Sequence, residues 1–411
     1  MLLLAFILAV LFWAALSLYL SHRQIVHVLR HREAVPGDFA ASVSLDQHRR
    51  AADYTVARER LGRVDTLIDT VVSLAWAMGG IGLLYAGVAA LVPPSILRGV
   101  VFLIGASALG TIVGLPLQLY RVFVLEERFG FNRTTARTFV LDRLKSGAIG
   151  LAVAIPLLSL ALWMMNAFNG SWWLWTWMGL VVLMVVAPTV YVRLIAPRFN
   201  RFTPLGDEAL RARIESLLAK AGFRASGLFT MDASRRSGHG NAFFIGFGRS
   251  KRIVLFDTLL AHSTADEVAA VVAHELGHFR HGHVVFGLVQ GALTLFIGLA
   301  GFGWLAKQAW LLPAFGLDRA DPALDLFVCL LLASVVGPLI APLSNWISRR
   351  HEFQADDYAR RTVGAAPMIS ALTGLARENA STLTPDPVYA LAHYSHPPVP
   401  IRVRQLRLAG G

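Results

Sequence analysis

The sequence contains few charged residues and almost no cysteine. Only 16% of its 411 residues are Asp, Glu, Lys or Arg, whereas soluble proteins usually carry about 25%. Hydrophobic residues make up 55% of the chain, and its mean hydropathy is +0.55. The single cysteine, Cys329, lies in an apolar segment, which excludes both a disulfide and a cysteine-based metal site. The composition therefore excludes an ordinary soluble protein and indicates a membrane protein.

Positive charge is the one excess among the polar residues, because the formal net charge is +12. A basic patch of this size is also a feature of nucleic-acid-binding proteins. Here, however, the basic residues fall in loops between apolar runs rather than in one stripe, as expected for arginines that flank membrane spans. We therefore expect the chain to contact a lipid bilayer and not nucleic acid.

Several apolar runs are long enough to cross a membrane, because about 20 residues of helix span about 30 Å of hydrocarbon. The seven segments that qualify are Leu2–Leu20, Leu67–Leu91, Val100–Tyr120, Ala148–Phe168, Trp172–Ile195, Val284–Leu305 and Leu324–Trp346. The first segment has no basic residues before it, and His22 and Arg23 follow it in place of a small-residue cleavage site. We expect an uncleaved span there rather than a signal peptide. The predicted fold is a predominantly α-helical, multi-pass membrane protein.

The distribution of basic residues predicts the orientation of these spans. Basic residues are concentrated in the loops after the first and third spans, whereas the connections Val92–Leu97 and Asn169–Ser171 contain no charge. The positive-inside rule then puts the N-terminus outside and the two basic loops in the cytoplasm. The segment Ala196–His283 and the C-terminal tail are cytoplasmic as well. We expect residues 1–195 to form a membrane domain with five spans, and residues 196–411 to form a catalytic domain that includes the last two.

Two histidines one helical turn apart suggest a metal site. Thr264 followed by Glu267 has the pattern of a capping box, which predicts that a helix begins there. Four residues separate His274 from His278, so both imidazoles lie on one face of that helix and can bind one zinc ion. Glu275 lies beside the metal, where it can take a proton from water activated by zinc and pass it to the leaving amine.

A catalytic zinc site needs a third protein ligand. His281 is seven residues from His274, which separates their Cα atoms by about 10 Å along the helix and prevents convergence. We interpret His281 and His283 as residues at the membrane edge. Glu352, directly after the last span, shares a helix face with Asp356, so Glu352 could bind zinc while Asp356 accepts a hydrogen bond from a ligating histidine. By spacing alone, the start of a solvated charged helix explains Glu352 equally well.

These motifs resemble those of the CAAX prenyl protease 1 family, which are membrane zinc metallopeptidases of the gluzincin type. The resemblance covers the seven spans, both helices of the metal site and Phe129-Gly130-Phe131-Asn132-Arg133-Thr134-Thr135, which is similar to the family's Gly-Phe-Asn-Lys/Arg-Thr-Thr element. It implies that Glu352 is the third ligand of one zinc ion per chain. It also implies a helical barrel that encloses a large intramembrane chamber, with the active site inside and facing the cytoplasm.

The resemblance also assigns Asn241, within Gly240-Asn241-Ala242-Phe243-Phe244, to the element that lies along the cleft edge and holds the substrate backbone. Without the resemblance, we would interpret Asn241 as an ordinary turn residue. The runs Ala242–Gly246 and Arg252–Phe256 are of β type and flank a Gly-Arg-Ser-Lys turn, which predicts a small hairpin. An edge strand beside the zinc ion could pair with an extended peptide.

In the tail, His396-Pro397-Pro398-Val399-Pro400-Ile401-Arg402 resembles the family's His-Pro-Pro…Arg element. The resemblance implies that His396 stabilises the oxyanion of the tetrahedral intermediate and that Arg402 lies close to the substrate. Amide hydrolysis does need a second electrophile opposite the metal, because charge develops on the carbonyl oxygen. Without the resemblance, His396 is only a loop histidine before two prolines, and we interpret His239 and His393 as loop histidines too.

The predicted activity is hydrolysis of peptide bonds, in the family by removal of the C-terminal tripeptide from prenylated CAAX substrates or related peptides. The short connection Ala306–Ala323, the absence of an ER-retrieval signal and the excess of arginine over lysine favour a bacterial inner membrane, which leaves the prenylated substrate open. One alternative is a broad-specificity protease for membrane-protein quality control. Another is a transporter with an incidental His-rich helix, although spans two to seven carry almost no ionisable residues at mid-membrane.

Overall fold

The computed structural model describes residues 1–168, 170–223, 226–245 and 252–410. Within these residues, seven helices are long and apolar enough to cross a membrane, and each overlaps one predicted span. They comprise α1 (Leu2–Arg30), α2 (Leu45–Ala75) with its continuation α3 (Ile81–Leu91), α4 (Ile96–Tyr120), α5 (Ala136–Ala167), α6 (Trp172–Val190), α10 (His283–Leu305) and α11 (Pro322–Val363). The prediction of a multi-pass helical membrane protein is confirmed.

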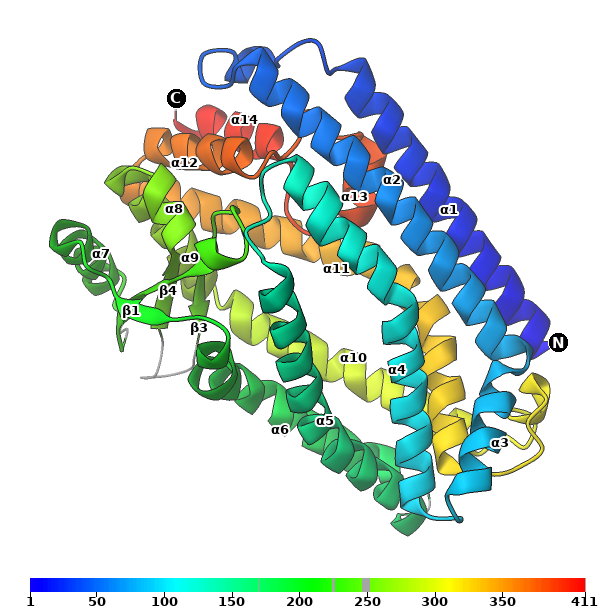
Figure 1. The fold of residues 1–411 in the computed structure, drawn as a ribbon. Coiled ribbons are helices and arrows are strands. Elements are labelled where there is room, and N and C mark those ends of the chain that lie inside the picture. Colours follow the sequence, from blue (N-terminus) through cyan, green and yellow to red (C-terminus); the bar gives the residue numbers. More distant parts are fainter. Residues whose placement is uncertain (169, 224–225, 246–251, 411) are drawn as a thin grey trace.

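The long helices form a closed ring, so the predicted helical barrel is also confirmed (Figure 1). Going round the ring, α3 contacts α4, α4 contacts α5, α5 contacts α6, and α6 contacts α10. Helix α10 contacts α11, α11 contacts α1, and α1 packs along α2 to complete the circle. The indole nitrogen of Trp13 donates a hydrogen bond to the carbonyl oxygen of Val335 at 2.9 Å, which joins α1 to α11. Cys329 is buried in the apolar core at this junction and is therefore a packing residue.

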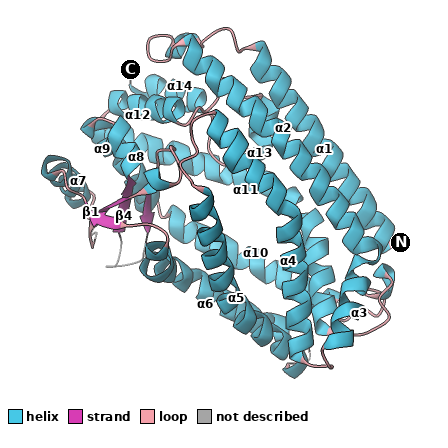
Figure 2. Ribbon diagram, viewed as in Figure 1, coloured by secondary structure: helices cyan, strands magenta, loops and turns pink. Residues whose placement is uncertain are grey.

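A small sheet lies at one end of the barrel, where Figure 2 shows its strands in magenta. Its strand order is β1-β2-β4-β3, with β1 at Phe202–Pro204, β2 at Leu228–Met231, β4 at Arg252–Phe256 and β3 at Ala242–Ile245. Strands β3 and β4 pair antiparallel, so the two strands of the predicted hairpin are confirmed, and β3 is an edge strand. The predicted Gly-Arg-Ser-Lys turn lies outside the described residues. The sheet is larger than predicted, because β2 joins β4 in parallel.

Strand β4 lies in the middle of the sheet because Ile253, Val254 and Leu255 are fully buried, as expected of a continuous apolar run. Helices α7 (Glu208–Lys220) and α8 (Asp257–His262) flank the sheet. Apolar residues of α7 and of the strands pack against α9 (Ala265–Arg280) in one core. Helix α9 is therefore held by the sheet on one side.

Helix α9 begins as predicted, with a capping box. The Thr264 hydroxyl accepts a hydrogen bond from the Glu267 backbone N–H at 3.3 Å. The Glu267 carboxylate accepts one from the Thr264 backbone N–H at 2.8 Å. On the side away from the sheet, α9 packs against α11 and against α12 (Ala365–Glu378). It ends before Gly282, which has a φ of +70° and therefore interrupts the helical path between α9 and α10.

The C-terminal segment returns to the first helix. Asp386 precedes α13 (Pro387–His393), and its carboxylate accepts from the Arg23 guanidinium of α1 at 3.0 Å. Its backbone N–H donates to the Gln24 side chain at 2.7 Å. Helix α14 (Val399–Gly410) then packs against α11 and α12. These contacts bring the residues between α13 and α14 to the same end of the barrel as α9.

Candidate metal centre

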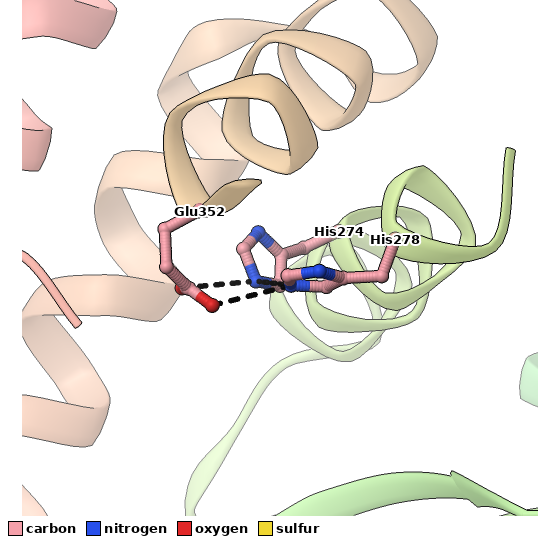
Figure 3. A group of neighbouring side chains, drawn as sticks. All are labelled: His274, His278 and Glu352. Atoms are coloured by element: carbon pink, nitrogen blue, oxygen red, sulfur yellow. Dashed lines mark hydrogen bonds and ion pairs between the residues drawn. The ribbon is translucent and has the colours of Figure 1, made fainter. Parts of the chain in front are cut away.

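His274 and His278 on α9 and Glu352 on α11 point toward one another (Figure 3). The Nε2 atoms of the two histidines are 3.2 Å apart. Glu352 Oε2 lies 3.5 Å from His274 Nε2, and Glu352 Oε1 lies 3.3 Å from His278 Nε2. Tetrahedral zinc with bonds of about 2.0 to 2.1 Å separates its ligand atoms by about 3.3 Å. The three side chains therefore have the spacing that a single zinc ion requires.

The hydrogen bonds of both imidazoles leave the two Nε2 atoms free to bind a metal. His274 Nδ1 lies 2.9 Å from the Asp356 carboxylate, so we assign the ring proton to Nδ1. His278 Nδ1 lies 3.0 Å from His283 Nδ1, and His283 Nε2 donates to the Gln354 side-chain oxygen at 2.8 Å. His283 Nδ1 is then an acceptor, which puts the His278 proton on Nδ1 as well. Both histidines present lone pairs to the same point.

Glu352 supplies the third ligand, a carboxylate oxygen, from a buried position. Among the described residues none donates a hydrogen bond to Glu352 Oε2, although the Arg402 guanidinium lies 3.3 Å away. Buried carboxylate oxygens are normally satisfied by a donor or a cation. A carboxylate oxygen that accepts no hydrogen bond lies beside two imidazole lone pairs here, and zinc prefers ligand atoms of these types. The residues present fit the metal.

His283 contributes to this arrangement although the sequence suggested only a position at the membrane edge. It is the first residue of the span α10, but it is also buried and contacts the ring of His278, a role that the sequence did not indicate. His281 is exposed and lies outside the ligand group, in agreement with the distance argument. The spacing of five residues between His278 and His283 carried no signal, because α9 ends between them and the break at Gly282 sets their relative position.

Arg402 on α14 contacts two of the acidic residues of the centre. Its guanidinium donates to both oxygens of Asp356, at 2.8 Å from Nε and 2.5 Å from Nη2. Burial by itself would raise the pKa of Asp356, but the Arg402 and His274 contacts outweigh burial and lower it. Asp356 is therefore an anion that accepts a hydrogen bond from the His274 Nδ1–H.

Glu275 faces a cavity of about 400 Å³ beside the ligands. Burial raises the pKa of Glu275 above its ordinary value. Among the described residues, none forms a hydrogen bond or an ion pair with its carboxylate. A carboxylate with a raised pKa is a stronger proton acceptor than an ordinary glutamate.

The same cavity contains the substrate residues suggested by the family resemblance. Asn241 lies directly before the edge strand β3, and its backbone oxygen accepts from the Phe256 N–H at 3.0 Å. His396 reaches the cavity from the tail, with Nε2 3.3 Å from Glu352 Oε1. Arg402 also lines the cavity, whereas Asp356 lies behind the ligands. Segments far apart in the chain thus meet round one space.

The loop before Asn241 rests on the segment Phe129–Thr135. The ring of Phe131 stacks on His239 with 4.2 Å between centroids, and its carbonyl oxygen accepts from the Gly238 N–H at 3.0 Å. His239 lines the cavity, although the sequence marked it only as a loop histidine. The Gly-Phe-Asn-Arg-Thr-Thr element therefore supports the cavity wall.

Gly277 allows α9 to lie close against α11. A Cβ atom at Gly277 would lie 2.8 Å from the Ala355 Cα and 3.0 Å from the Ala355 carbonyl oxygen. We expect Gly277→Ala to destabilise the fold by about 1 to 3 kcal/mol and to weaken zinc binding, because the ligands of the two helices move apart. Thermal unfolding and zinc content would measure both effects. Gly287→Ala on α10, where a Cβ meets no atom within 4 Å, is the matched control. Equal stability of the two variants would contradict the close contact.

Comparison with known proteins identifies the family. Residues 24–201 match the family profile described as "CAAX prenyl protease N-terminal, five membrane helices", and residues 204–409 match "Peptidase family M48". The chain is 33% identical over 400 residues to a CAAX prenyl protease 1 homolog of Oryza sativa, covering 94% of this chain and 93% of the relative. The chain belongs to the CAAX prenyl protease 1 family. It is an M48 metallopeptidase, which excludes the alternative of a transporter.

Other members of the family share most of the chain. CAAX prenyl protease 1 of Saccharomyces cerevisiae is 37% identical over 316 residues, which cover 73% of this chain and 70% of the yeast protein. The crystal structure of S. mikatae Ste24p superposes with a TM-score of 0.92 at 29% identity, covering 98% of both chains. Within this CAAX prenyl protease 1 homologue, His274, His278 and Glu352 form the zinc site typical of M48 peptidases, as predicted.

Proposed function

We propose that this enzyme removes the C-terminal tripeptide from prenylated CAAX substrates or from related peptides. The observation that carries the proposal is the cavity in which Glu275, His396 and the edge strand β3 meet the zinc ligands. An extended peptide that pairs with β3 would lie along this cavity with its backbone beside the ligand atoms. Asn241, at the start of β3, would hold that backbone in place.

The chemistry divides among the residues of the cavity. Zinc, when bound, acts as a Lewis acid on the scissile carbonyl and lowers the pKa of the attacking water. Glu275 takes the proton from this water and passes it to the leaving amine. His396, on the open side of the ligands, donates a hydrogen bond to the oxygen on which negative charge develops. Arg402 lies close enough to the cavity to contact the substrate while it holds Asp356.

Asp356 acts through His274 and is a positioning residue. We expect Asp356→Asn to weaken zinc binding by about 10- to 100-fold, because the anionic partner of His274 Nδ1 is lost. Competition with a chelator of known affinity would measure the zinc dissociation constant. Asp357→Asn, one residue along α11 and paired with Arg360 and Arg361, is the matched control. An unchanged zinc affinity in Asp356→Asn would contradict this role.

The proposal is tested by incubating the purified enzyme with a farnesylated CAAX peptide and identifying the products by mass spectrometry. Release of an intact C-terminal tripeptide, lost on treatment with a zinc chelator, is the expected result. A misfolded membrane protein serves as the second substrate. Cleavage of that protein at many internal sites, with no tripeptide released from the peptide, would overturn the proposal in favour of membrane-protein quality control.

We also propose a location and a division of the chain. The basic loops after the first and third spans support an active site that faces the cytoplasm. The excess of arginine and the short connection between α10 and α11 support a bacterial inner membrane. Residues 1–195 would then form the membrane domain and residues 196–411 the metallopeptidase domain. Labelling of single introduced cysteines in loops 31–44 and 92–95 of sealed cells, in a Cys329→Ala background, would test the orientation.

A further inference from the structure

Two more cavities adjoin the metal centre. One, of about 410 Å³, shares His396 and Asn379 with the cavity that contains Glu275. The other, of about 690 Å³, extends along α2 between α1 and the segment Arg121–Glu126 that continues α4. Arg58 of α2 and Tyr389 of α13 line both. All three spaces share Asn379, so both further cavities adjoin the cavity of the zinc ligands.

Arg58 is the cation where the two larger spaces meet, and its charge has no acidic partner among the described residues. Its guanidinium lies 5.5 Å from the centre of the Tyr54 ring and forms no hydrogen bond or ion pair with the described part of the chain. Two acidic residues line the larger of these spaces as well, and each accepts a hydrogen bond from a tyrosine hydroxyl. Glu59 accepts from the Tyr389 hydroxyl at 2.7 Å, and Glu126 accepts from the Tyr54 hydroxyl at 2.7 Å.

The other arginines of these cavities are placed differently. Arg121 forms an ion pair with Asp65 at 3.4 Å. Arg63 donates to the Ser21 hydroxyl at 3.1 Å and lines only the larger space. Arg402 is bound to Asp356. Arg58 is thus the arginine that lies in the same space as His396 and forms no hydrogen bond or ion pair with the described residues.

We propose that Arg58 binds the free C-terminal carboxylate of the peptide substrate. The inference rests on the proposed function, because a short C-terminal product places a carboxylate inside the protein close to the scissile bond. Arg58 is exposed to the cavities that it lines, and a guanidinium can pair with both oxygens of a carboxylate. Binding at Arg58 would make the enzyme select substrates by the distance between the chain end and the scissile bond.

The test compares two peptides of one sequence, one with a free C-terminal carboxylate and one with a C-terminal amide. We expect kcat/KM of the unmodified enzyme to be about 10- to 100-fold higher for the carboxylate, the range for a hydrogen bond to a charged group. Arg58→Gln should lower kcat/KM for the carboxylate by that factor and leave the amide unchanged. Arg60→Gln, two residues along α2 and outside these cavities, is the matched control and should keep the full preference.

Three results would overturn the inference. The first is that the unmodified enzyme cleaves both peptides equally well. The second is that Arg58→Gln slows the cleavage of both peptides equally. The third is that Arg63→Gln loses the preference for the carboxylate peptide while Arg58→Gln keeps it. Failure of the unmodified enzyme to cleave either peptide would instead overturn the proposed function. Zinc content and melting temperature report whether Arg58→Gln folds. If it does not, Arg58→Lys, which keeps the charge without the paired geometry, should reduce the preference while the amide rate stays constant.

Discussion

Replacing Glu275 with Gln should abolish peptide hydrolysis and leave one zinc ion bound per chain. Glutamine has nearly the same shape but cannot accept a proton, so the loss falls on the proton-transfer step, with an expected decrease in kcat of about 10²- to 10⁴-fold. The zinc ligands do not include Glu275, so metal binding should be unaffected. The measurement is kcat for a CAAX-type peptide together with zinc content from elemental analysis.

A matched control for this variant is Glu215→Gln. Glu215 is an exposed residue of α7 and does not line the metal-centre cavity. Its substitution should leave both rate and zinc content unchanged. Cleavage at the unmodified rate by Glu275→Gln would refute Glu275 as the proton acceptor. Loss of zinc from that variant would show that it holds the ligands rather than the proton.

Glu352→Ala should produce an enzyme that contains no zinc and has no activity. The substitution removes the carboxylate ligand and leaves two neutral imidazoles, and a catalytic zinc site normally needs three protein ligands. It also removes a charge partner of the buried Arg402, so the melting temperature should fall. Elemental analysis of the purified protein and thermal unfolding measure the two effects, and added zinc should not restore activity.

Asp357→Ala serves as the control for Glu352→Ala. Asp357 is on the same helix and pairs with Arg360 and Arg361 at the partly exposed surface of α11. The Asp357→Ala variant should keep its zinc ion, because exposed ion pairs of this kind contribute little to the stability of the fold. A Glu352→Ala variant with one tightly bound zinc ion per chain would refute the ligand set.

The parts of the fold that follow from neighbouring residues could be predicted. The seven spans follow from runs of apolar residues, and the start of α9 follows from Thr264 and Glu267. The position of His274 and His278 on one face follows from the period of the helix. In each case the deciding interaction joins residues a few positions apart, so the pattern is visible in the sequence.

Contacts between distant segments could not be predicted in this way. Spacing by itself left Glu352 equally explained as part of a solvated helix, and the family resemblance settled it. The contact between His283 and His278 was missed, because it depends on the bend at Gly282. The bond from Arg402 to Asp356 joins α14 to α11, and Arg58 reaches the cavities only because α2 lies beside the tail.

The sequence by itself determined a multi-pass helical membrane protein with two zinc-binding histidines on one helix, beside the glutamate proposed as proton acceptor, because apolar length and helical period act over short distances. Only the tertiary structure decided how Glu352 approaches those histidines, which groups orient their rings, and which arginine lines the adjoining cavity with His396. Those features depend on how α9, α11 and α14 pack, and Gly277 has no side chain to keep the first two apart. Packing of this kind sums many weak contacts between residues far apart in the chain, and no local pattern records it.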